Sequence, residues 1–198
     1  MKNVLVILLS CLGVAAGAAP MTVSPVLGAT SMSLKGSDIS GSRGGLQAGA
    51  IVNFESSIAD LQYETGLLYS QAGAKDDALL ASVEYELNYL AVPLGVQYRL
   101  SGEDRSFWAA RGGLTLAALM SAKAKSQVFG SGSETDIKDQ TNTFDMLPYI
   151  GIVKSWSIGE SQRLALDFTY TRGLMKVFKD QSSNTEGWTI NLAYGFAF

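Results

Sequence analysis

The sequence predicts an all-β fold: an eight-stranded antiparallel up-and-down transmembrane β-barrel. Three observations lead to this prediction. Bulky apolar residues alternate with small or polar ones in most extended segments, most regularly over residues 187–198. Short and long connections follow one another along the chain. Beyond the N-terminal segment, no apolar run reaches the roughly 20 residues of a membrane-spanning helix, so a chain of this composition is either soluble or crosses a membrane as a closed barrel.

The first eighteen residues are typical of a secretory signal peptide. A short basic start precedes an almost unbroken apolar run over residues 4–16, and Ala16, Gly17 and Ala18 provide the small residues of a cleavage site. We expect cleavage after Ala18, which leaves residues 19–198 as one barrel domain. A lipoprotein signal is the alternative, because the Leu-Leu-Ser-Cys stretch ending at Cys11 loosely resembles a lipobox.

Composition excludes several kinds of chemistry. The chain has no histidine, and its single cysteine, Cys11, leaves with the predicted signal. Disulfides, thiolate nucleophiles, imidazole bases and histidine-bound metals are therefore excluded from the mature protein. The formal net charge is −3, and nothing in this charge balance suggests binding to nucleic acid, which needs a concentrated basic patch. We predict that the protein is not an enzyme and has no catalytic residues, cofactor or metal, since no carboxylate pair is placed in a cleft by this pattern.

Eight segments are expected to form the strands: 23–34, 45–55, 60–74, 83–100, 106–122, 144–157, 163–174 and 187–198. The connections 56–59, 101–105 and 158–162 are short, whereas 35–44, 75–82, 123–143 and 175–186 are longer. In membrane barrels the short turns and the long loops lie on opposite sides of the bilayer. An even number of strands places both ends of the domain on the side of the short turns. The longest loop is polar and rich in Gly and Ser, which predicts a solvated loop.

The strands differ in how clearly they alternate. Segments 23–34 and 144–157 alternate weakly and contain Pro25 and Pro148. The others have one bulky apolar face and one small or polar face, as in Leu164, Leu166 and Phe168 against Asp167. Segment 83–100 changes phase: its first half has apolar residues at odd positions and its second half at even positions. We predict a bulge near Tyr89, with the first half projecting beyond the lipid.

The polar faces would point into the lumen and the apolar faces toward lipid. An eight-stranded barrel is only wide enough for side chains to fill it, so we expect a structural network of ion pairs, most plausibly Arg111 or Arg99 with Glu64 and Asp167. A narrow ion path is the alternative. The full inward polar set is Gln47, Asn53, Glu64, Gln97, Arg99, Arg111, Asp167, Thr169 and Asn191.

Aromatic residues sort by height into two groups, as bilayer interfaces select. With strands running alternately up and down, we place Phe54, Tyr98, Trp108, Trp156 and Phe198 at the rim of the short turns. Toward the rim of the long loops we place Tyr69, Tyr89, Phe144, Tyr170 and Trp188. We expect Trp108, Trp156, Trp188 and Phe198 to lie at the membrane interfaces.

Several stretches resemble one family: the small outer-membrane β-barrel domain that includes PorT-like proteins, related in architecture to OmpX-like and OmpA-like barrels. The stretches are 61–75, 89–100 with its Tyr-Leu-x-x-Pro-Leu segment, and 166–174. The terminal Phe198 resembles the last residue of such barrels, which their assembly machinery reads. The resemblance implies an eight-stranded barrel in the outer membrane of a Gram-negative bacterium, in contact with outer-membrane lipid and lipopolysaccharide, and no defined activity.

Our interpretation is a monomeric outer-membrane barrel with a structural or surface-interaction role. Two alternatives remain: a narrow pore for small solutes, and a secreted soluble barrel that binds a lipid-like ligand inside. Glu84 and Glu86 lie near Asp76 and Asp77, and we interpret these carboxylates as an ordinary solvated face, with a divalent-cation site as the alternative.

Overall fold

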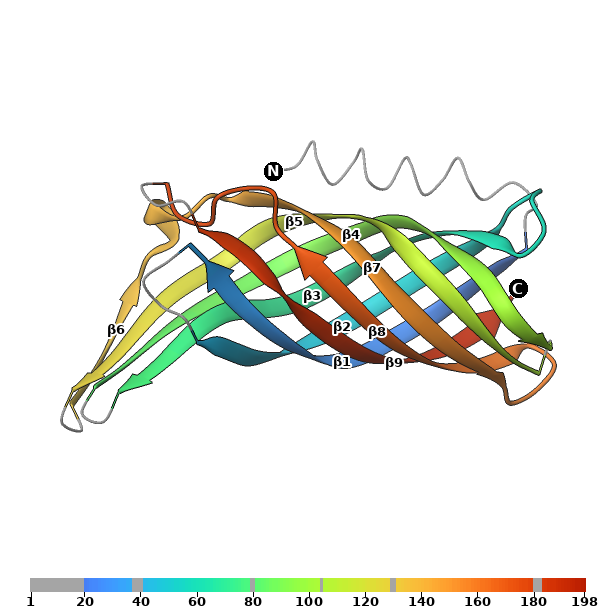
Figure 1. Ribbon diagram of the computed structural model, residues 1–198, viewed down its shortest axis with the longest axis horizontal. Helices are drawn as coiled ribbons and strands as arrows, with labels where there is room; N and C mark the ends of the chain where they lie inside the picture. Colours follow the sequence, from blue (N-terminus) through green and yellow to red (C-terminus); the bar gives the residue numbers. More distant parts are fainter. Residues whose placement is uncertain (1–19, 37–40, 79–80, 104, 129–130, 180–182) are drawn as a thin grey trace.

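The computed structural model describes residues 20–36, 41–78, 81–103, 105–128, 131–179 and 183–198, so the predicted signal peptide lies outside the described residues. Its strands form one antiparallel sheet in the order β4-β3-β2-β1-β9-β8-β7-β5-β6, and β4 also pairs with β5. This second pairing closes eight of the strands into a barrel (Figure 1), which confirms the predicted fold class. The strands are β1 (Met21–Lys35), β2 (Ser42–Glu55), β3 (Leu61–Ala78), β4 (Ala81–Glu103), β5 (Ser106–Val128), β6 (Ser131–Asp136), β7 (Phe144–Ser157), β8 (Gln162–Arg172) and β9 (Asn184–Ala197).

The first and last strands, β1 and β9, pair along almost their whole length, and Met21 and Phe198 continue this pairing at the end of the barrel that carries the short turns. The backbone N–H of Phe198 donates a hydrogen bond to the carbonyl of Met21 at 2.8 Å, and the reverse bond is 3.3 Å long. At the opposite end, β3, β4 and β5 continue past the neighbouring strands and β6 folds back along β5 (Figure 1). We call the part of β3–β6 formed by residues 72–78, 81–88, 121–128 and 131–136 the strand extension.

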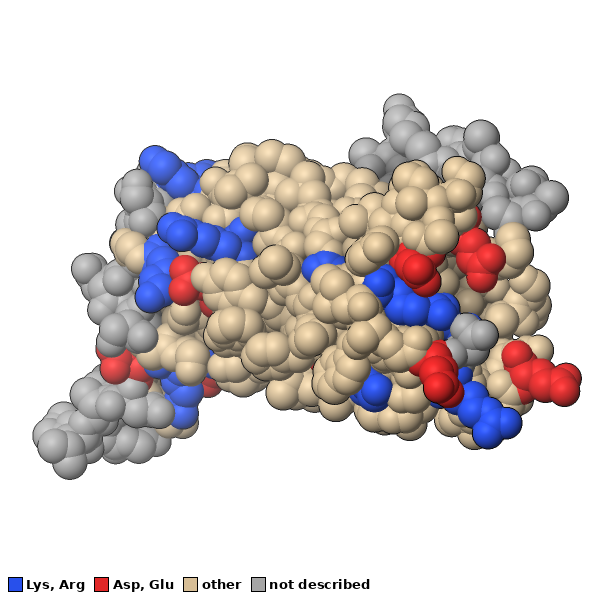
Figure 2. Space-filling model, turned by 45° about the vertical axis from the view of Figure 1, so that its right-hand side comes forward, with Lys and Arg blue, Asp and Glu red and all other residues tan. Residues whose placement is uncertain are grey.

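Side chains alternate in and out along the barrel wall because the side-chain period of a strand is two. The bulky apolar residues face outward: Leu27 is 65% exposed and Ile150 is 67% exposed. Polar residues such as Glu64, Asp167 and Asn191 are buried inside. Charged side chains gather toward the two ends of the molecule, and the middle of the visible face is largely uncharged (Figure 2). A soluble barrel around a lipid-like ligand needs the opposite arrangement, so that alternative is wrong.

The predicted change of phase lies on a different strand from the one expected. Residues of β4 keep one phase: Leu87, Tyr89 and Ala91 are all buried. The register slips between Asn88 and Tyr89 because β5 contains one extra residue there, Met120. Tyr89 therefore points into the lumen, and its predicted place in the outer aromatic rim is wrong. Apolar residues alternate in the outer half of β4 because they line the barrel mouth, not because the strand bulges.

Two predicted loops are shorter than expected. Strands β3 and β4 extend to residues 78 and 81, within the predicted loop 75–82. The predicted loop 123–143 contains the end of β5, all of β6 and a single 3₁₀ turn, η1 (Lys138–Gln140). The polar, glycine-rich composition indicated a loop, but the backbone pairs of β6 with β5 satisfy its hydrogen-bonding groups instead. None of the helical segments among the described residues is long and apolar enough to span a bilayer.

Candidate functional site: the lumen and its outer mouth

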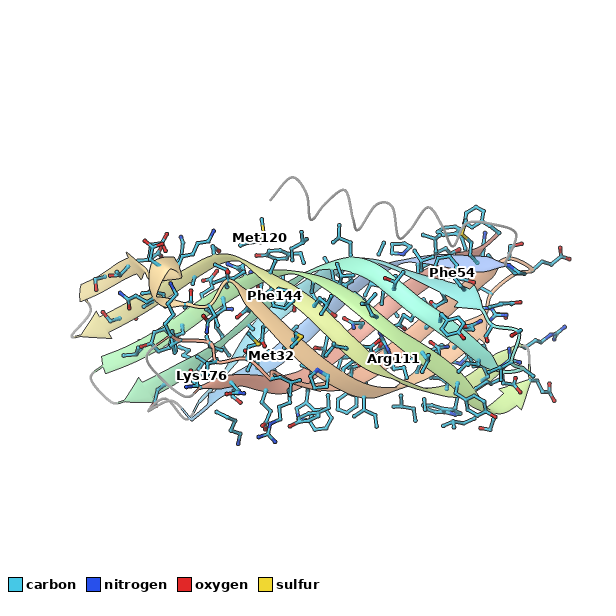
Figure 3. All side chains as sticks on the ribbon, turned by 90° about the horizontal axis from the view of Figure 1, so that it is seen from above. Met32, Phe54, Arg111, Met120, Phe144 and Lys176 are labelled. Atoms are coloured by element: carbon cyan, nitrogen blue, oxygen red, sulfur yellow. The ribbon has the colours of Figure 1, made fainter. Side chains whose placement is uncertain are left out.

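A buried ion-pair cluster lies across the barrel. Arg111 on β5 contacts both Glu64 on β3 and Asp167 on β8, and all three side chains are almost fully buried. The inward phase of these three strands brings the residues to one level of the lumen, where Figure 3 shows Arg111 inside the barrel. One guanidinium thus faces two carboxylates, an arrangement in which each ionised group depends on the others for solvation.

Tyr149 on β7 completes this cluster. Its hydroxyl donates a 2.9 Å hydrogen bond to Glu64 Oε1, and the guanidinium carbon of Arg111 lies 5.2 Å from the centre of its ring. The tyrosine hydroxyl fits between two glycines: a Cβ at Gly95 would overlap it, and a Cβ at Gly113 would lie 2.9 Å from it. Sequence reasoning missed Tyr149 because its strand alternates weakly, although the glycines facing it were a usable signal.

The remaining inward polar residues surround the cluster without all joining it. Thr169 donates a 2.6 Å hydrogen bond to Asp167 Oδ1, and Gln47 donates one of 3.2 Å to the hydroxyl of Ser70. The side-chain nitrogen of Asn53 and the side-chain oxygen of Asn191 are buried and form no hydrogen bond within the described part of the chain. Such atoms need water or a ligand as partner, since a buried unsatisfied polar group is costly.

Arg99 lies apart from Arg111, near the short turns. Its Nε is 3.6 Å from Asp60 Oδ1, and its guanidinium carbon lies 4.5 Å from the centre of the Phe107 ring. Arg163 approaches the same ring, at 5.4 Å. A cavity of about 200 Å³ opens here, lined by Arg99, Phe107, Gln97 and the turn residues around Asp60. Of the two arginines predicted to pair with Glu64 and Asp167, only Arg111 does so.

Two small cavities lie on either side of the Arg111 cluster. One of about 70 Å³ lies toward the outer mouth and is lined by Tyr89, Thr115 and Thr171. The other, of about 60 Å³, lies toward the short turns and is lined by Asn53, Gln62 and Arg163. Arg111 and Asn191 border both cavities. Each cavity has room for about two water molecules, at roughly 30 Å³ per molecule, and is far smaller than the roughly 300–1,000 Å³ of small-molecule sites.

The outer mouth is covered by the connections that follow β6 and β8. Ile137 and Val177 from these connections are buried against Leu34, Ala74 and Leu87 of the barrel and the strand extension. Phe178 meets Tyr85 edge to face at 5.2 Å. The two connections also pair with each other, through a β-bridge between Thr141 and Phe178 and backbone hydrogen bonds around it. We call residues 137–143 and 173–179 the mouth cap.

Asp145 fastens the mouth cap to β7. Its Oδ1 accepts hydrogen bonds from the backbone N–H groups of Met146, at 2.8 Å, and Met175, at 3.1 Å. The carboxylate is buried, and a Cβ on Gly173 would lie 2.6 Å from its other oxygen. Sequence reasoning had no signal for the cap, because Ile137 is a single apolar residue within a polar stretch and Val177 lies in a segment expected to be a loop.

The strand extension carries a ladder of charges across β4, β5 and β6, which Arg43 of the nearby strand β2 joins. Arg43 contacts Glu84 at 2.6 Å and Glu86 at 3.3 Å, and Lys125 contacts Glu86 at 2.8 Å. Lys123 and Glu134 continue the ladder at 2.6 Å. The side chain of Arg43 passes beside Gly73, whose φ of +149° few other residues adopt. The hydrogen bond from Lys125 is the main reason that the pKa of Glu86 lies below its ordinary value.

The charge ladder occupies two of the carboxylates that were considered as an alternative divalent-cation site. The carboxylates of Glu84 and Glu86 are already bound by arginine and lysine side chains of neighbouring strands. Over the described ranges, no three His, Cys, Asp or Glu side chains are grouped closely enough to hold a metal ion.

The aromatic residues predicted at the interfaces are exposed on the outer wall. Trp108, Trp156 and Phe198 lie toward the end of the short turns, and Trp188 lies toward the other end. Trp188 stacks on Phe168 at 4.9 Å and contacts Tyr170 at 4.6 Å between ring centres. Phe144 is exposed at the same end, where Figure 3 shows it on the barrel wall.

Comparisons with known proteins agree with this architecture. The family model of the outer membrane protein beta-barrel domain matches residues 11–179. Neisserial surface protein A is 12% identical, with a TM-score of 0.50, over 89% of this chain and 96% of that one. The outer membrane protein OprG from Pseudomonas aeruginosa is 11% identical, with a TM-score of 0.52, over 91% of this chain and 96% of that one.

At these identities the solved structures show the fold alone. No curated protein sequence matches the chain. The family match covers most of the chain and is independent of the fold comparison, whereas the narrower resemblance to PorT-like proteins stays a prediction. The chain belongs to the outer membrane protein beta-barrel domain family, and its place is the bacterial outer membrane.

Proposed function

We propose that this protein is a non-conducting outer-membrane barrel that acts through its extracellular surface. In this proposal the lumen is closed by side chains, and the strand extension and the mouth cap form the part that meets the cell's surroundings. The observation that carries the proposal is the double obstruction of the lumen. The Arg111 cluster lies between two cavities of about 70 and 60 Å³, and the mouth cap covers the outer one.

The strand extension supports the second half of the proposal. It continues the sheet well past the barrel rim, and its charge ladder contains Arg43, Lys123 and Lys125 against Glu84, Glu86 and Glu134. Loops of barrels that serve only as membrane anchors have no need for such ordered structure. A scaffold of paired strands places surface residues in fixed positions, which suits recognition of another molecule.

Planar-bilayer recording tests the closed lumen. We expect the purified barrel to give no conductance steps above the lipid background. A variant with Val177 replaced by Asp, which weakens the apolar packing of the mouth cap, should still be silent because the Arg111 cluster remains. Reproducible conductance steps from the wild type would favour the narrow pore instead.

Cysteine labelling tests the orientation, since the mature chain is predicted to lack cysteine. Ser133→Cys on β6 should react with a membrane-impermeant maleimide on intact cells. Ser161→Cys, an exposed residue of the turn between β7 and β8, should react only after the outer membrane is opened. The reverse labelling pattern would place the strand extension in the periplasm and remove the basis for a surface role.

The narrow pore remains a second candidate for one reason. Both cavities are partly polar, and Asn53, Arg111 and Asn191 each have a buried side-chain atom without a hydrogen-bonding partner within the described residues. Water in these cavities would satisfy those atoms. A hydrated lumen needs only a shift of the mouth cap and Arg111 to become continuous, and the bilayer recording distinguishes the two candidates.

A further inference from the structure

One lysine faces outward within the apolar wall of the barrel. Lys154 lies on β7, two residues before Trp156 on the same face, and opposite Trp108 of β5 and Leu166 of β8. Its Nζ lies 5.0 Å from the ring centre of Trp108 and 5.9 Å from that of Trp156. Both rings are exposed at the end of the short turns, so two indoles hold the ammonium group at the level of that membrane interface.

The groups around Lys154 offer it no negative charge. The outward residues beside it are Trp108 and Ala110 on β5, Leu166 and Phe168 on β8, and Ile152 and Trp156 on its own strand. Among the residues that the structure describes, no carboxylate forms an ion pair with Lys154, and neither indole N–H donates a hydrogen bond to another residue. An ammonium has three donors, and a ring face can engage only part of that capacity.

We propose that Lys154, Trp108 and Trp156 bind the phosphate of a phospholipid in the membrane leaflet next to the short turns. An unpaired cation on the lipid face is tolerated near an interface but not deep in the bilayer, so an anion from the membrane must meet it there. The phosphodiester is the anion at that depth. It accepts hydrogen bonds from the ammonium and from both indoles, which all lie on one patch of the wall.

The site favours a lipid with net negative charge. A zwitterionic headgroup carries its own ammonium, which competes with Lys154 for the same phosphate. Phosphatidylglycerol has no such group and is the probe of choice. The proposal rests on the membrane placement of the barrel and is independent of whether the lumen conducts or the strand extension binds a partner.

Indole N–H resonances provide a direct test, because the chain has three tryptophans. The folded protein in uncharged maltoside micelles should give three indole cross-peaks in a ¹⁵N–¹H spectrum. Titration with phosphatidylglycerol should shift the Trp108 and Trp156 peaks in a saturable way. Trp188, at the opposite interface, should shift little and is the internal control.

Variants assign the effect to Lys154. Lys154→Gln should raise the half-saturating lipid concentration about tenfold, as expected for loss of a charge-assisted hydrogen bond. Lys154→Arg, which keeps the charge, should stay near the wild type and also covers the case in which the glutamine variant folds poorly. Lys179→Gln, an exposed lysine of the mouth cap, is the matched control and should titrate like the wild type.

Three results would overturn the proposal: equal shifts of all three indoles, an unchanged titration of Lys154→Gln, or the same shifts with inorganic phosphate at equal concentration. The first two would leave Lys154 as a residue that is satisfied by its aromatic contacts alone. The third would replace the lipid by a free anion. Silence in the bilayer recording has no bearing on any of these outcomes.

Discussion

At the scale of single residues, the lumen contains one buried positive charge and two buried negative charges that stabilise one another. Arg111 is one positive charge between Glu64 and Asp167, so it stabilises both carboxylates at once. Burying three ions costs desolvation free energy, and their mutual attraction offsets that cost only while all partners are present. Loss of the arginine leaves two neighbouring negative charges, whereas loss of either carboxylate leaves a neutral pair.

Replacement of Arg111 by Gln should therefore lower the free energy of unfolding by about 3–5 kcal/mol. Urea unfolding in phospholipid vesicles would measure this loss. Lys179→Gln, in the mouth cap, should change stability by no more than about 0.5 kcal/mol. The triple variant Arg111→Gln, Glu64→Gln, Asp167→Asn should recover part of the loss because no charge remains buried. A triple variant less stable than Arg111→Gln would contradict this account.

The close contact between Gly95 and the hydroxyl of Tyr149 leads to a second prediction about single residues. A methyl group at position 95 would overlap the Tyr149 hydroxyl and lie 2.6 Å from the carbonyl oxygen of Gly112, so Gly95→Ala should destabilise the barrel by about 1–3 kcal/mol. Tyr149→Phe removes that hydroxyl and should cost about 1–3 kcal/mol alone, because Glu64 loses a donor. In a double-mutant cycle by urea unfolding, the combined loss should be smaller than the sum. Strict additivity would show that the two residues do not meet.

The period of two predicts which residues share a face, and it placed Glu64, Arg111 and Asp167 on inward faces from sequence alone. It does not give the relative height of residues on different strands, which is set by the stagger of the barrel. That is why Arg99 and Arg111 were equal candidates from sequence, although only Arg111 meets the carboxylates. Tyr149 was missed because neighbouring apolar residues on β7 face both ways.

At the scale of elements, the extra residue Met120 reverses which residues of β5, odd-numbered or even-numbered, face inward. Before it, odd residues of β5 face inward, and after it Ala122 and Ala124 take the inward positions. This shift leaves Lys123 and Lys125 on the outer face, where they reach Glu134 and Glu86. A bulge of one residue exchanges the two faces of everything beyond it.

Deletion of Met120 should therefore leave the strand extension ordered, because Leu119 and Ser121 then pair as consecutive residues with Tyr89 and Asn88. Lys123 and Lys125 keep their places on the outer face. Limited trypsin digestion should cleave the deletion variant within residues 121–138 as slowly as the wild type, and the barrel should keep its heat-dependent gel mobility. Met120→Ala keeps the extra residue and is the matched control. Faster cleavage of the deletion variant than of Met120→Ala would show that the extra residue itself is needed for the strand extension to form.

The charge ladder predicts how the strand extension responds to acid. The pKa of Glu86 is lowered, mainly by the hydrogen bond from Lys125, from an ordinary value of 4.5. Its contribution is therefore complete above about pH 4.5 and is lost as the pH falls through the lowered pKa. Because the side chain of Lys125 is 40% exposed to solvent, the effect should be modest and weaker in high salt.

Amide hydrogen exchange, corrected for intrinsic rates, would measure this response. Protection of residues 82–88 and 121–127 should fall between pH 5 and about pH 3 in low salt, while protection of the barrel strands stays constant. Glu86→Gln should show the weaker protection at both pH values. A wild-type response that persists in Glu86→Gln would assign the acid sensitivity to another carboxylate.

The alternating pattern predicted the barrel strands but not their outer continuations. Beyond the lipid both faces of a strand meet either water or neighbouring protein. Apolar residues no longer need to face outward there, so their alternation no longer predicts the strand. Residues of β6 are small and polar, and their composition indicates a loop. They form a strand because β5 presents a free edge to pair with, which is a property of the folded neighbour and not of the segment.

At the scale of the whole molecule, the pairing of β1 with β9 joins the first and last strands of the chain and, together with the β4–β5 pairing, closes the barrel. Phe198 exchanges two backbone hydrogen bonds with Met21 at this closure, yet its side chain is 73% exposed. The closure therefore uses the backbone of Phe198, and the ring adds little packing to the folded barrel. A role of the ring in recognition by the barrel-assembly machinery stays a prediction from the family resemblance.

Phe198→Ala separates that role from stability. The substitution keeps both backbone hydrogen bonds, so the refolded barrel should lose at most about 1 kcal/mol in urea unfolding. If the ring is read during assembly, the amount of folded protein in the outer membrane of cells should nevertheless fall severalfold, measured by heat-dependent gel mobility of membrane fractions. Phe196→Ala removes an exposed aromatic side chain two residues earlier, in β9, and is the matched control. Two results would contradict this role: an equal fall in the folded amount of both variants, or a loss of unfolding free energy in refolded Phe198→Ala large enough to explain its lower amount in cells. Either result would assign the ring to packing against lipid, because assembly would then respond to lost stability and not to the identity of the terminal residue.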